Sequence, residues 1–416
     1  MRCSDSSSIH SFVYLFPSTS ASLLNGSSSI ESPRQTASTA VELRSSSTET
    51  SVMPGEGVLK HLLTLLEDYK DLNPSLIDTT SIPSTVDFAK QVSKGYPCVY
   101  NAFQGQADDR GQVVPHFNSS LTSFPAANWN KQDLIRLLGE TKLEVAVTPD
   151  GRADDLKQID GKSEHVFLSP ANVEMTIAEL FVKLNDKNDD SARSEQSKPV
   201  FYLQSQNSNL TATNLKCLLR EVPQNFPFAE PVLGEPEAIN IWIGDERSVT
   251  STHRDPYENL YLVLKGSKTF TLYPPVDELT LPVEYVLTGK YTFDSKSRQF
   301  DVELDVTRDV DEPSARIPWV NITSSESRSE IIRRHHIHQY SSPRVVTVKE
   351  GQILYLPSGW YHMVEQRCGT WDEDGSRAPC IAINYWYDME YAGEKYVMRQ
   401  LISRMASELQ QAGIVS

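Results

Sequence analysis

The stretch Thr250-Ser-Thr-His-Arg-Asp-Pro-Tyr-Glu-Asn-Leu-Tyr261 lies in the part of the chain where short extended segments become frequent. From Ala238 onward, runs of β-branched and aromatic residues are separated by Gly, Pro and Ser, as in antiparallel strands. We predict strands over residues 239–243, 259–264, 268–273, 345–348, 352–356 and 380–387. The surroundings of Tyr261 are therefore expected to be dominated by β-structure.

The turns between these segments indicate how the strands are joined. Gly266-Ser267 has the length of a two-residue hairpin turn, and Glu350-Gly351 is expected to join a second pair of strands. Several short antiparallel strands predict a double-stranded β-helix, the jelly roll found in cupins. We place this core at residues 231–388, with a long insert at 280–342.

The N-terminal half alternates helical and extended patterns, which could flank such a core. Apolar residues at helical spacing predict helices over residues 55–70, 84–94, 129–138 and 175–184, with strands over 97–100, 143–148 and 200–204. Ser84 and Gly95 have the residue types of helix caps. We expect residues 53–230 to flank a mainly β core, and residues 389–416 to form a C-terminal helix.

Composition narrows the class of protein. The 416 residues carry a formal net charge of −16 and are 39% hydrophobic, enough for a sizeable core. Phosphate contacts need clustered Lys and Arg, so we expect no direct nucleic-acid partner. No apolar run approaches the ~20 residues of a membrane span, so we expect no membrane partner. The five cysteines include no Cys-x-x-Cys pair, which indicates a reducing compartment. We expect the cytoplasm, with the nucleus as a second location.

Residues 1–52 differ from the rest of the chain. They are dominated by Ser and Thr and contain few large apolar residues after Leu24. Such a segment buries too little surface to offset its ordering entropy, so we predict disorder. A translation start at Met53 and a targeting segment are the alternatives, although Asp5, Glu31 and Glu42 count against a transit peptide.

Three residues have the types of a metal site. His253 and Asp255 are separated by one residue, and positions i and i+2 of an extended segment face the same side. His362 ends the stretch Gly351-Gln-Ile-Leu-Tyr-Leu-Pro-Ser-Gly-Trp-Tyr-His362, after a Pro-Ser-Gly turn that could direct it inward. Two imidazoles and one carboxylate can cap one face of an octahedral ion, as in non-haem Fe(II) oxygenases. A lone His-x-Asp motif is weak evidence for a metal site, so the case for one depends on the residues predicted to lie near it.

Those neighbours indicate a pocket for an anion. Lys268 falls in phase with Phe270 and Leu272, which makes it a lysine in an apolar row. Asn259 and Asn384 lie on predicted strands and could line the same cavity. A buried ammonium group would suit a dicarboxylate cosubstrate, whereas an edge lysine pointing to water is the structural alternative.

Together these motifs resemble the JmjC-type 2-oxoglutarate oxygenases, and most closely the jumonji domain-containing protein 7 subfamily. The resemblance runs from about residue 55 to the C-terminus. Beyond His253, Asp255, Lys268 and His362, it rests on the following segments: Val145-Ala-Val-Thr-Pro-Asp-Gly151, Asn240-Ile-Trp-Ile-Gly244, Tyr257-Glu-Asn-Leu-Tyr261, Lys268-Thr-Phe-Thr-Leu-Tyr-Pro-Pro275, Pro318-Trp319, Leu354-Tyr-Leu-Pro357 and Asn384-Tyr-Trp-Tyr-Asp-Met-Glu-Tyr391.

The resemblance implies the roles of individual residues. His253, Asp255 and His362 would bind Fe(II) and form the catalytic centre, with 2-oxoglutarate and O2 as cosubstrates. Lys268 would pair with the distal carboxylate of 2-oxoglutarate. The rest of that pocket would come from Tyr202, Thr250, Asn259 and Asn384. Members of the subfamily are implied to be lysyl 3-hydroxylases of developmentally regulated GTP-binding proteins, which are related to translation factors.

Other functions and contacts stay open from the sequence. One is N-methyl-lysine demethylation of histones or other proteins; another is a non-catalytic cupin-like binding protein. The apolar positions of the C-terminal helix suggest a homodimer. A second metal site in His335, His336 and His338 is less favoured than a metal-free loop. Glu258, beside the metal site, is expected to help attract a lysine side chain.

Overall fold

The computed structural model describes residues 56–107, 113–117, 124–159, 161, 163–185, 198–204, 208–305, 316–371 and 375–414. All of them belong to one unit, Gly55–Ser416. The disorder predicted for residues 1–52 lies outside the described residues. Within the described part of the chain, no helix combines the length and apolar character needed to cross a bilayer.

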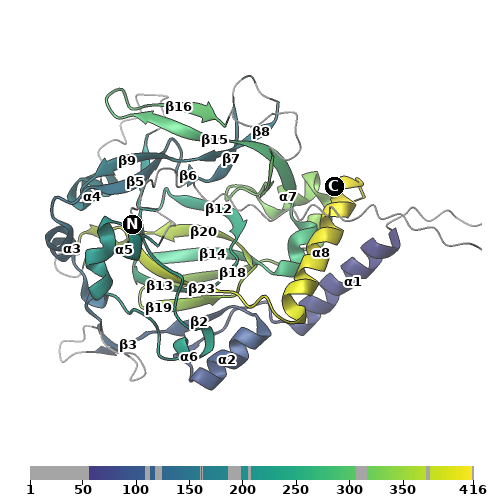
Figure 1. Cartoon of the computed structure of the whole chain (residues 1–416), viewed down its shortest axis with the longest axis horizontal. Helices are drawn as coiled ribbons and strands as arrows, with labels where there is room; N and C mark the ends of the chain where they lie inside the picture. The colour runs from purple at the N-terminus through teal and green to yellow at the C-terminus, as the bar shows by residue number, and fades with distance from the viewer. Residues whose placement is uncertain are drawn as a thin grey trace, which may run out of the picture. The chain divides into compact units, whose positions relative to one another are not determined.

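Two facing β-sheets form the centre of this unit (Figure 1). The six-stranded sheet has the order β1 (Thr79–Ser81), β2 (Cys98–Asn101), β19 (Gln352–Leu356), β13 (Tyr257–Lys265), β23 (Cys380–Asp388) and β11 (Ala238–Gly244). The five-stranded sheet has the order β18 (Arg344–Lys349), β14 (Ser267–Tyr273), β20 (Tyr361–Arg367), β12 (Val249–Arg254) and β6 (Arg152–Ala153). The mainly β jelly roll predicted from the sequence is confirmed.

The predicted hairpins are wrong, although their strands exist. β13 pairs with β19 and β23, whereas β14 pairs with β18 and β20 in the other sheet. Likewise β18 and β19, on either side of Glu350-Gly351, lie in different sheets. The tight turns therefore carry the chain across the sandwich. Turn residues indicate where the chain reverses direction. Which strands pair depends on how the two sheets pack, and the local sequence does not encode that.

Strand β13 is buried on both faces, and its alternating side chains point into two different hydrophobic cores. Tyr261 and Val263 point between the sheets, where they meet Phe270 and Val364 of the five-stranded sheet. Leu260, Leu262 and Leu264 point the other way, into the core formed with the N-terminal helices and strands. The sequence therefore reads as an almost continuous apolar run, because neither face meets water.

Helices cover the outside of this sandwich close to where periodicity predicts them. The longer ones are α1 (Glu56–Leu72), α2 (Thr85–Lys94), α3 (Lys131–Leu138), α4 (Ile177–Asn185) and α8 (Glu394–Gln411). Ser84 and Gly95 cap α2 as predicted. Helices α1 and α8 lie side by side in Figure 1 and share an apolar cluster that includes Leu62, Leu66 and Leu409. The predicted C-terminal helix is thus confirmed, although it starts five residues later than the predicted 389–416 range.

Smaller elements complete the N-terminal region. Strand β5 (Leu143–Thr148) lies between β10 (Val200–Tyr202) and β9 (Ala171–Met175), and β3 (Phe103–Ala107) pairs with β4 (Val113–Phe117). The short helices are η1 (Pro125–Asn128), α5 (Asn209–Ala212), η2 (Asn214–Arg220) and α6 (Glu230–Leu233). β1 and β2, which precede residue 231, belong to the six-stranded sheet. The domain boundaries at 231 and 388 stay a prediction.

The 280–342 insert has its own order. Strands β15 (Val283–Asp294) and β16 (Gln299–Leu304) form a sheet with β7 (Asp155–Gln158) and β8 (His165–Ser169), and β17 (Ile317–Val320) pairs with β15. The insert also contains α7 (Arg328–Arg334) and η5 (His336–Tyr340). Helix η3 (Pro275–Thr280) leads into it, and the ribbon of β21 (Gly369–Thr370) and β22 (Arg377–Ala378) lies beyond it in the chain. The insert thus extends the sandwich with a further sheet, seen at the top of Figure 1.

The turn at Gly266 gives the first testable prediction. Gly266 has φ +74°, and a Cβ there would lie 2.3 Å from the carbonyl oxygen of Arg367. We expect Gly266→Ala to lower the free energy of unfolding by about 2–3 kcal/mol, through backbone strain plus the clash. Gly139→Ala is the matched control, because Gly139 has φ +51° but open space around its Cα. Equal losses in denaturant unfolding would contradict the role of the close approach.

Candidate metal and cosubstrate site

The two histidines of the predicted triad face each other on neighbouring strands. His253 of β12 lies directly opposite His362 of β20 in the antiparallel register, and their ring centres are 4.3 Å apart. Asp255 follows the end of β12, and its carbonyl oxygen accepts a hydrogen bond from Gly359 N at 3.0 Å. This backbone bond ties the segment that carries Asp255 to the turn that precedes His362.

Each histidine is oriented by a backbone carbonyl two residues earlier. Nδ1 of His253 lies 2.8 Å from the oxygen of Ser251, and Nδ1 of His362 lies 3.0 Å from that of Trp360. A carbonyl only accepts, so Nδ1 carries the proton in both rings and Nε2 is left with a lone pair. Burial, together with His253, lowers the pKa of His362 to about 4, so this ring is neutral near pH 7.

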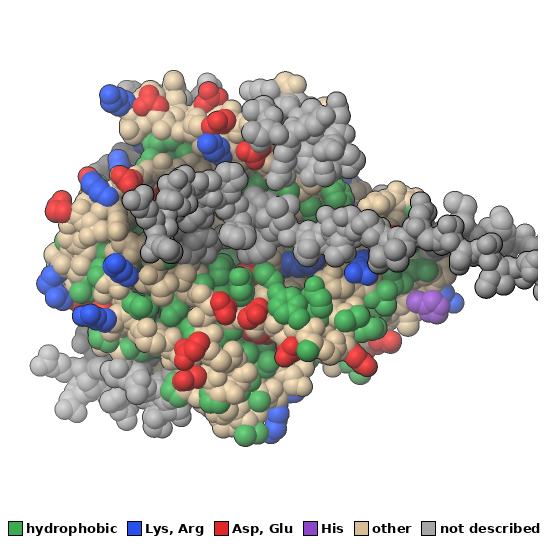
Figure 2. Space-filling model, viewed as in Figure 1, with side chains coloured by type: hydrophobic (Ala, Val, Ile, Leu, Met, Phe, Trp, Pro, Cys, Tyr) green, Lys and Arg blue, Asp and Glu red, His purple; other side chains and the backbone are tan. Residues whose placement is uncertain are grey.

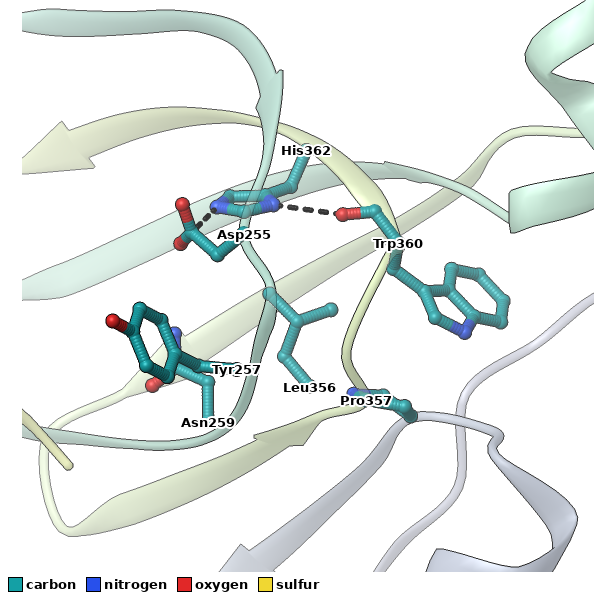
Figure 3. A pocket seen from close by; sticks show the side chains of 7 residues that line it. All are labelled: Asp255, Tyr257, Asn259, Leu356, Pro357, Trp360 and His362. Carbon is teal, nitrogen blue, oxygen red and sulfur yellow. Dashed lines mark hydrogen bonds and ion pairs between the residues drawn. The ribbon is translucent and has the colours of Figure 1, made fainter. Parts of the chain in front are cut away.

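These lone pairs converge on the carboxylate of Asp255. Its Oδ1 lies 3.7 Å from Nε2 of His253, and its Oδ2 lies 3.6 Å from Nε2 of His362, the contact that Figure 3 draws. Metal–ligand bonds of about 2.0–2.2 Å place neighbouring ligand atoms roughly 3 Å apart, so a small contraction would close the site around an ion. The nitrogen and carboxylate donors, with one face open, suit non-haem Fe(II).

Within the described residues, His253, Asp255 and His362 are the only three His, Cys, Asp or Glu side chains grouped closely enough to hold a metal. The His-rich stretch forms no such group: His336 is exposed, and His338 Nδ1 lies 3.0 Å from the carbonyl oxygen of Thr280. The preference for a metal-free stretch stays a prediction. The four described cysteines are free.

Lys268 lies inside the sandwich and not at an edge. Its side chain is buried, and Nζ donates to the hydroxyl of Tyr202 at 2.9 Å and to Oε1 of Gln366 at 2.6 Å. Burial by itself lowers the pKa of the ammonium group, but the hydroxyls of Tyr202 and Tyr261 raise it above its ordinary value. The group is therefore charged near neutral pH.

The partners of Lys268 in the described part of the chain do not neutralise its charge. Among the described residues, no carboxylate lies within ion-pair distance of its Nζ, and the groups it contacts are neutral. Another buried lysine, Lys265, pairs with Glu350 at 2.9 Å. Because a buried, unpaired charge is costly, the chemistry of this pocket favours an anionic ligand.

One cavity of about 430 Å3, open to solvent, connects the triad with Lys268. The predicted site residues Tyr202, Thr250, Asn259 and Asn384 all line it. Asn384 accepts from Trp242 Nε1 at 2.8 Å, and its amide donates to Oδ1 of Asn259 at 3.4 Å. Figure 3 shows a smaller pocket that shares Asp255 and His362 with this cavity and that Tyr257, Leu356, Pro357 and Trp360 help to line. The structure thus brings every sequence-predicted site residue together.

Two assignments need correction. Gln366 was missed, although His362, Val364 and Gln366 alternate along β20 and therefore share a face. The expectation that Glu258 attracts a substrate lysine is wrong. Asn259 lines the cavity, so Glu258 lies on the opposite face of β13, where it is buried and accepts from Tyr355 and Ser358.

A two-sheet barrel with His-x-Asp and a distant His at the mouth of a lysine-containing cavity defines a cupin-type oxygenase scaffold. Residues 117–393 match the family model described as "Cupin-like domain". The chain belongs to this cupin-like family and, with the relatives below, to the JmjC oxygenases, as the sequence motifs predicted. JmjC oxygenases use Fe(II) and 2-oxoglutarate, and the triad could bind such a metal.

Curated relatives cover most of the chain. It is 33% identical to JmjC domain-containing protein E of Dictyostelium discoideum, over 66% of this chain and 77% of that protein. It is 32% identical to the human bifunctional peptidase and (3S)-lysyl hydroxylase JMJD7, over 69% and 80%. It is also 32% identical to the lysine-specific demethylase JMJ32 of Arabidopsis thaliana, over 75% and 81%.

Proposed function

We propose that this chain is an Fe(II)- and 2-oxoglutarate-dependent protein hydroxylase that hydroxylates lysyl C3 in a GTP-binding protein related to translation factors. The observation that carries the proposal is Lys268, a buried cation that has no carboxylate partner among the described residues and lies in the same cavity as the His-Asp-His triad. The printed name of the human relative supports lysyl hydroxylation.

Each site residue has a role in this proposal. His253, Asp255 and His362 hold Fe(II), and the proton on each Nδ1 keeps both imidazoles turned toward the ion. Lys268, with Tyr202 and Thr250, would bind the distal carboxylate of 2-oxoglutarate, and Asn259 and Asn384 would complete its pocket. Fe(II) held there would supply the oxidising chemistry, in which 2-oxoglutarate and O2 give CO2 and succinate, with one oxygen atom of O2 in succinate and the other inserted into the substrate C–H bond.

Demethylation is the second candidate, because the Arabidopsis relative with the same identity is named a lysine-specific demethylase. Mass spectrometry of candidate GTPase peptides, incubated with the protein, Fe(II), ascorbate and 2-oxoglutarate, separates the two. We expect the mass of one added oxygen on an unmethylated peptide. Loss of a methyl-derived unit from a methylated peptide would favour demethylation, and cleaved peptides would favour the peptidase activity in the name of the human relative.

A non-catalytic binding protein is the third candidate; it would have the same residues but would not turn over 2-oxoglutarate. Calorimetry tests it by measuring whether the chain binds Fe(II) and 2-oxoglutarate. Absence of Fe(II) and 2-oxoglutarate binding by the purified chain would favour this reading over the proposal.

The proposed homodimer has a candidate surface on α8. Val397, Met398 and Leu401 are exposed there, and Figure 2 shows hydrophobic side chains at the surface where Figure 1 places α8. Met405 and Leu409 instead pack against the α1 cluster. A monomeric mass in solution scattering would refute the dimer. The cytoplasmic location, with the nucleus second, stays a prediction that imaging of a tagged chain tests.

A further inference from the structure

Helix α8 presents a row of polar side chains toward the core. Lys395, Arg399 and Ser403 are four residues apart, so they align along one face of the helix. Lys395 Nζ donates to the carbonyl oxygen of Val92, near the end of α2. Arg399 and Ser403 are partly buried, and both contact groups that adjoin the triad.

Arg399 holds the turn that leads into His362. Its Nη1 lies 3.1 Å from Oγ of Ser358, and that hydroxyl donates to Oε1 of Glu258 at 2.8 Å. The other oxygen of Glu258 accepts from the hydroxyl of Tyr355 at 2.7 Å. At Gly359, φ is +77°, and a Cβ would lie 3.4 Å from Arg399 Nη1, so the guanidinium packs directly on the turn.

Ser403 reaches the other ligand-bearing segment, one turn further along α8. Its hydroxyl donates to Oε2 of Glu278, which also accepts from Arg254 Nη1 at 2.8 Å. Arg254 lies between His253 and Asp255 in the sequence. Its guanidinium lies over the ring of Tyr361, 4.9 Å from the centroid, and Tyr361 immediately precedes His362. This contact therefore joins β12 to β20 directly beside the triad.

We propose that α8 is a positioning element for the metal site, in which Arg399 and Ser403 set the spacing between the segment of His253 and Asp255 and the turn before His362. The inference rests on the proposed function insofar as the triad binds a metal. The ligand atoms stand 3.6–3.7 Å apart, so a site for bonds of about 2.1 Å tolerates little further separation. Glu258 is buried, and the network stays favourable only while its partners remain in place.

The test uses the purified full-length chain and Mn(II) as the probe, so that no substrate is needed. We expect Arg399→Ala to raise the Mn(II) dissociation constant about tenfold, the lower end of losses seen when groups behind metal ligands are removed. Ser403→Ala should give a smaller rise. The matched control is Arg404→Ala, which removes the same charge from an exposed position of α8 and should leave the dissociation constant unchanged.

Hydrogen exchange in the metal-free protein provides the second measurement. The amide of Gly359 is protected by its bond to the carbonyl oxygen of Asp255, and Arg399→Ala should speed its exchange while Arg404→Ala does not. Should Arg399→Ala fail to fold, Ser403→Ala supports the same comparison.

Wild-type affinity and unchanged exchange in both variants would overturn the inference. A wild-type chain that does not bind Mn(II) would contradict the proposed function, and exchange at Gly359 would then decide the positioning role by itself.

Discussion

His253→Ala is expected to abolish 2-oxoglutarate turnover and to weaken Fe(II) binding by more than about 100-fold. Loss of a group that merely supports a metal ligand costs about 10–100-fold, and here a ligand itself is removed. The remaining donors, Asp255 and His362, would leave an ion largely coordinated by water. The small side chain also removes the bond from Nδ1 to the carbonyl oxygen of Ser251.

Two readouts separate this effect from unfolding. Mn(II) binding and succinate release should both be lost, while the metal-free variant should unfold cooperatively. His336→Ala is the matched control, since His336 is exposed and belongs to no metal-capable group among the described residues. Retained 2-oxoglutarate turnover in purified His253→Ala would remove the triad from the catalytic centre.

Lys268→Met is expected to raise the KM for 2-oxoglutarate by a factor of about 100 or more. Breaking a buried ion pair by removal of one partner costs about 3–5 kcal/mol, and about 1.4 kcal/mol corresponds to tenfold in affinity. Methionine keeps most of the aliphatic volume beside Tyr202 and Gln366 while it removes the charge. Mn(II) binding without 2-oxoglutarate should change little, because the triad is untouched.

A second consequence concerns stability without ligand. Replacing a buried charge by an apolar group is often neutral or stabilising, so the ligand-free Lys268→Met protein should melt no earlier than wild type. Lys265→Met is the control: Lys265 is equally buried but paired with Glu350, so it should lose stability and keep its KM. An unchanged KM in Lys268→Met would exclude Lys268 as the cosubstrate anchor.

The sequence alone determined the parts of this protein that depend on short-range periodicity. Alternation predicted the strands around Tyr261 and Ile383, helical spacing predicted α1 and α8, and residue types predicted the caps of α2. The same alternation put Lys268 in an apolar row. His-x-Asp and a distant His supplied the right donor types, because the side chains that can bind a metal are recognised from residue type alone. Alternation also placed Glu258 on the face of β13 opposite Asn259, which the functional expectation overlooked.

Only the tertiary structure decided what depends on residues distant in the chain. Packing of two sheets, and not turn length, placed β13 and β14 in different sheets. The register of β14 against β20 brought Gln366 to Lys268, from 98 residues away. The docking of α8 brought Arg399 to Ser358 and Ser403 to Glu278. Strand periodicity says which face a side chain takes, but the groups that meet it across the sandwich follow from long-range pairing, which has no local signature in the sequence.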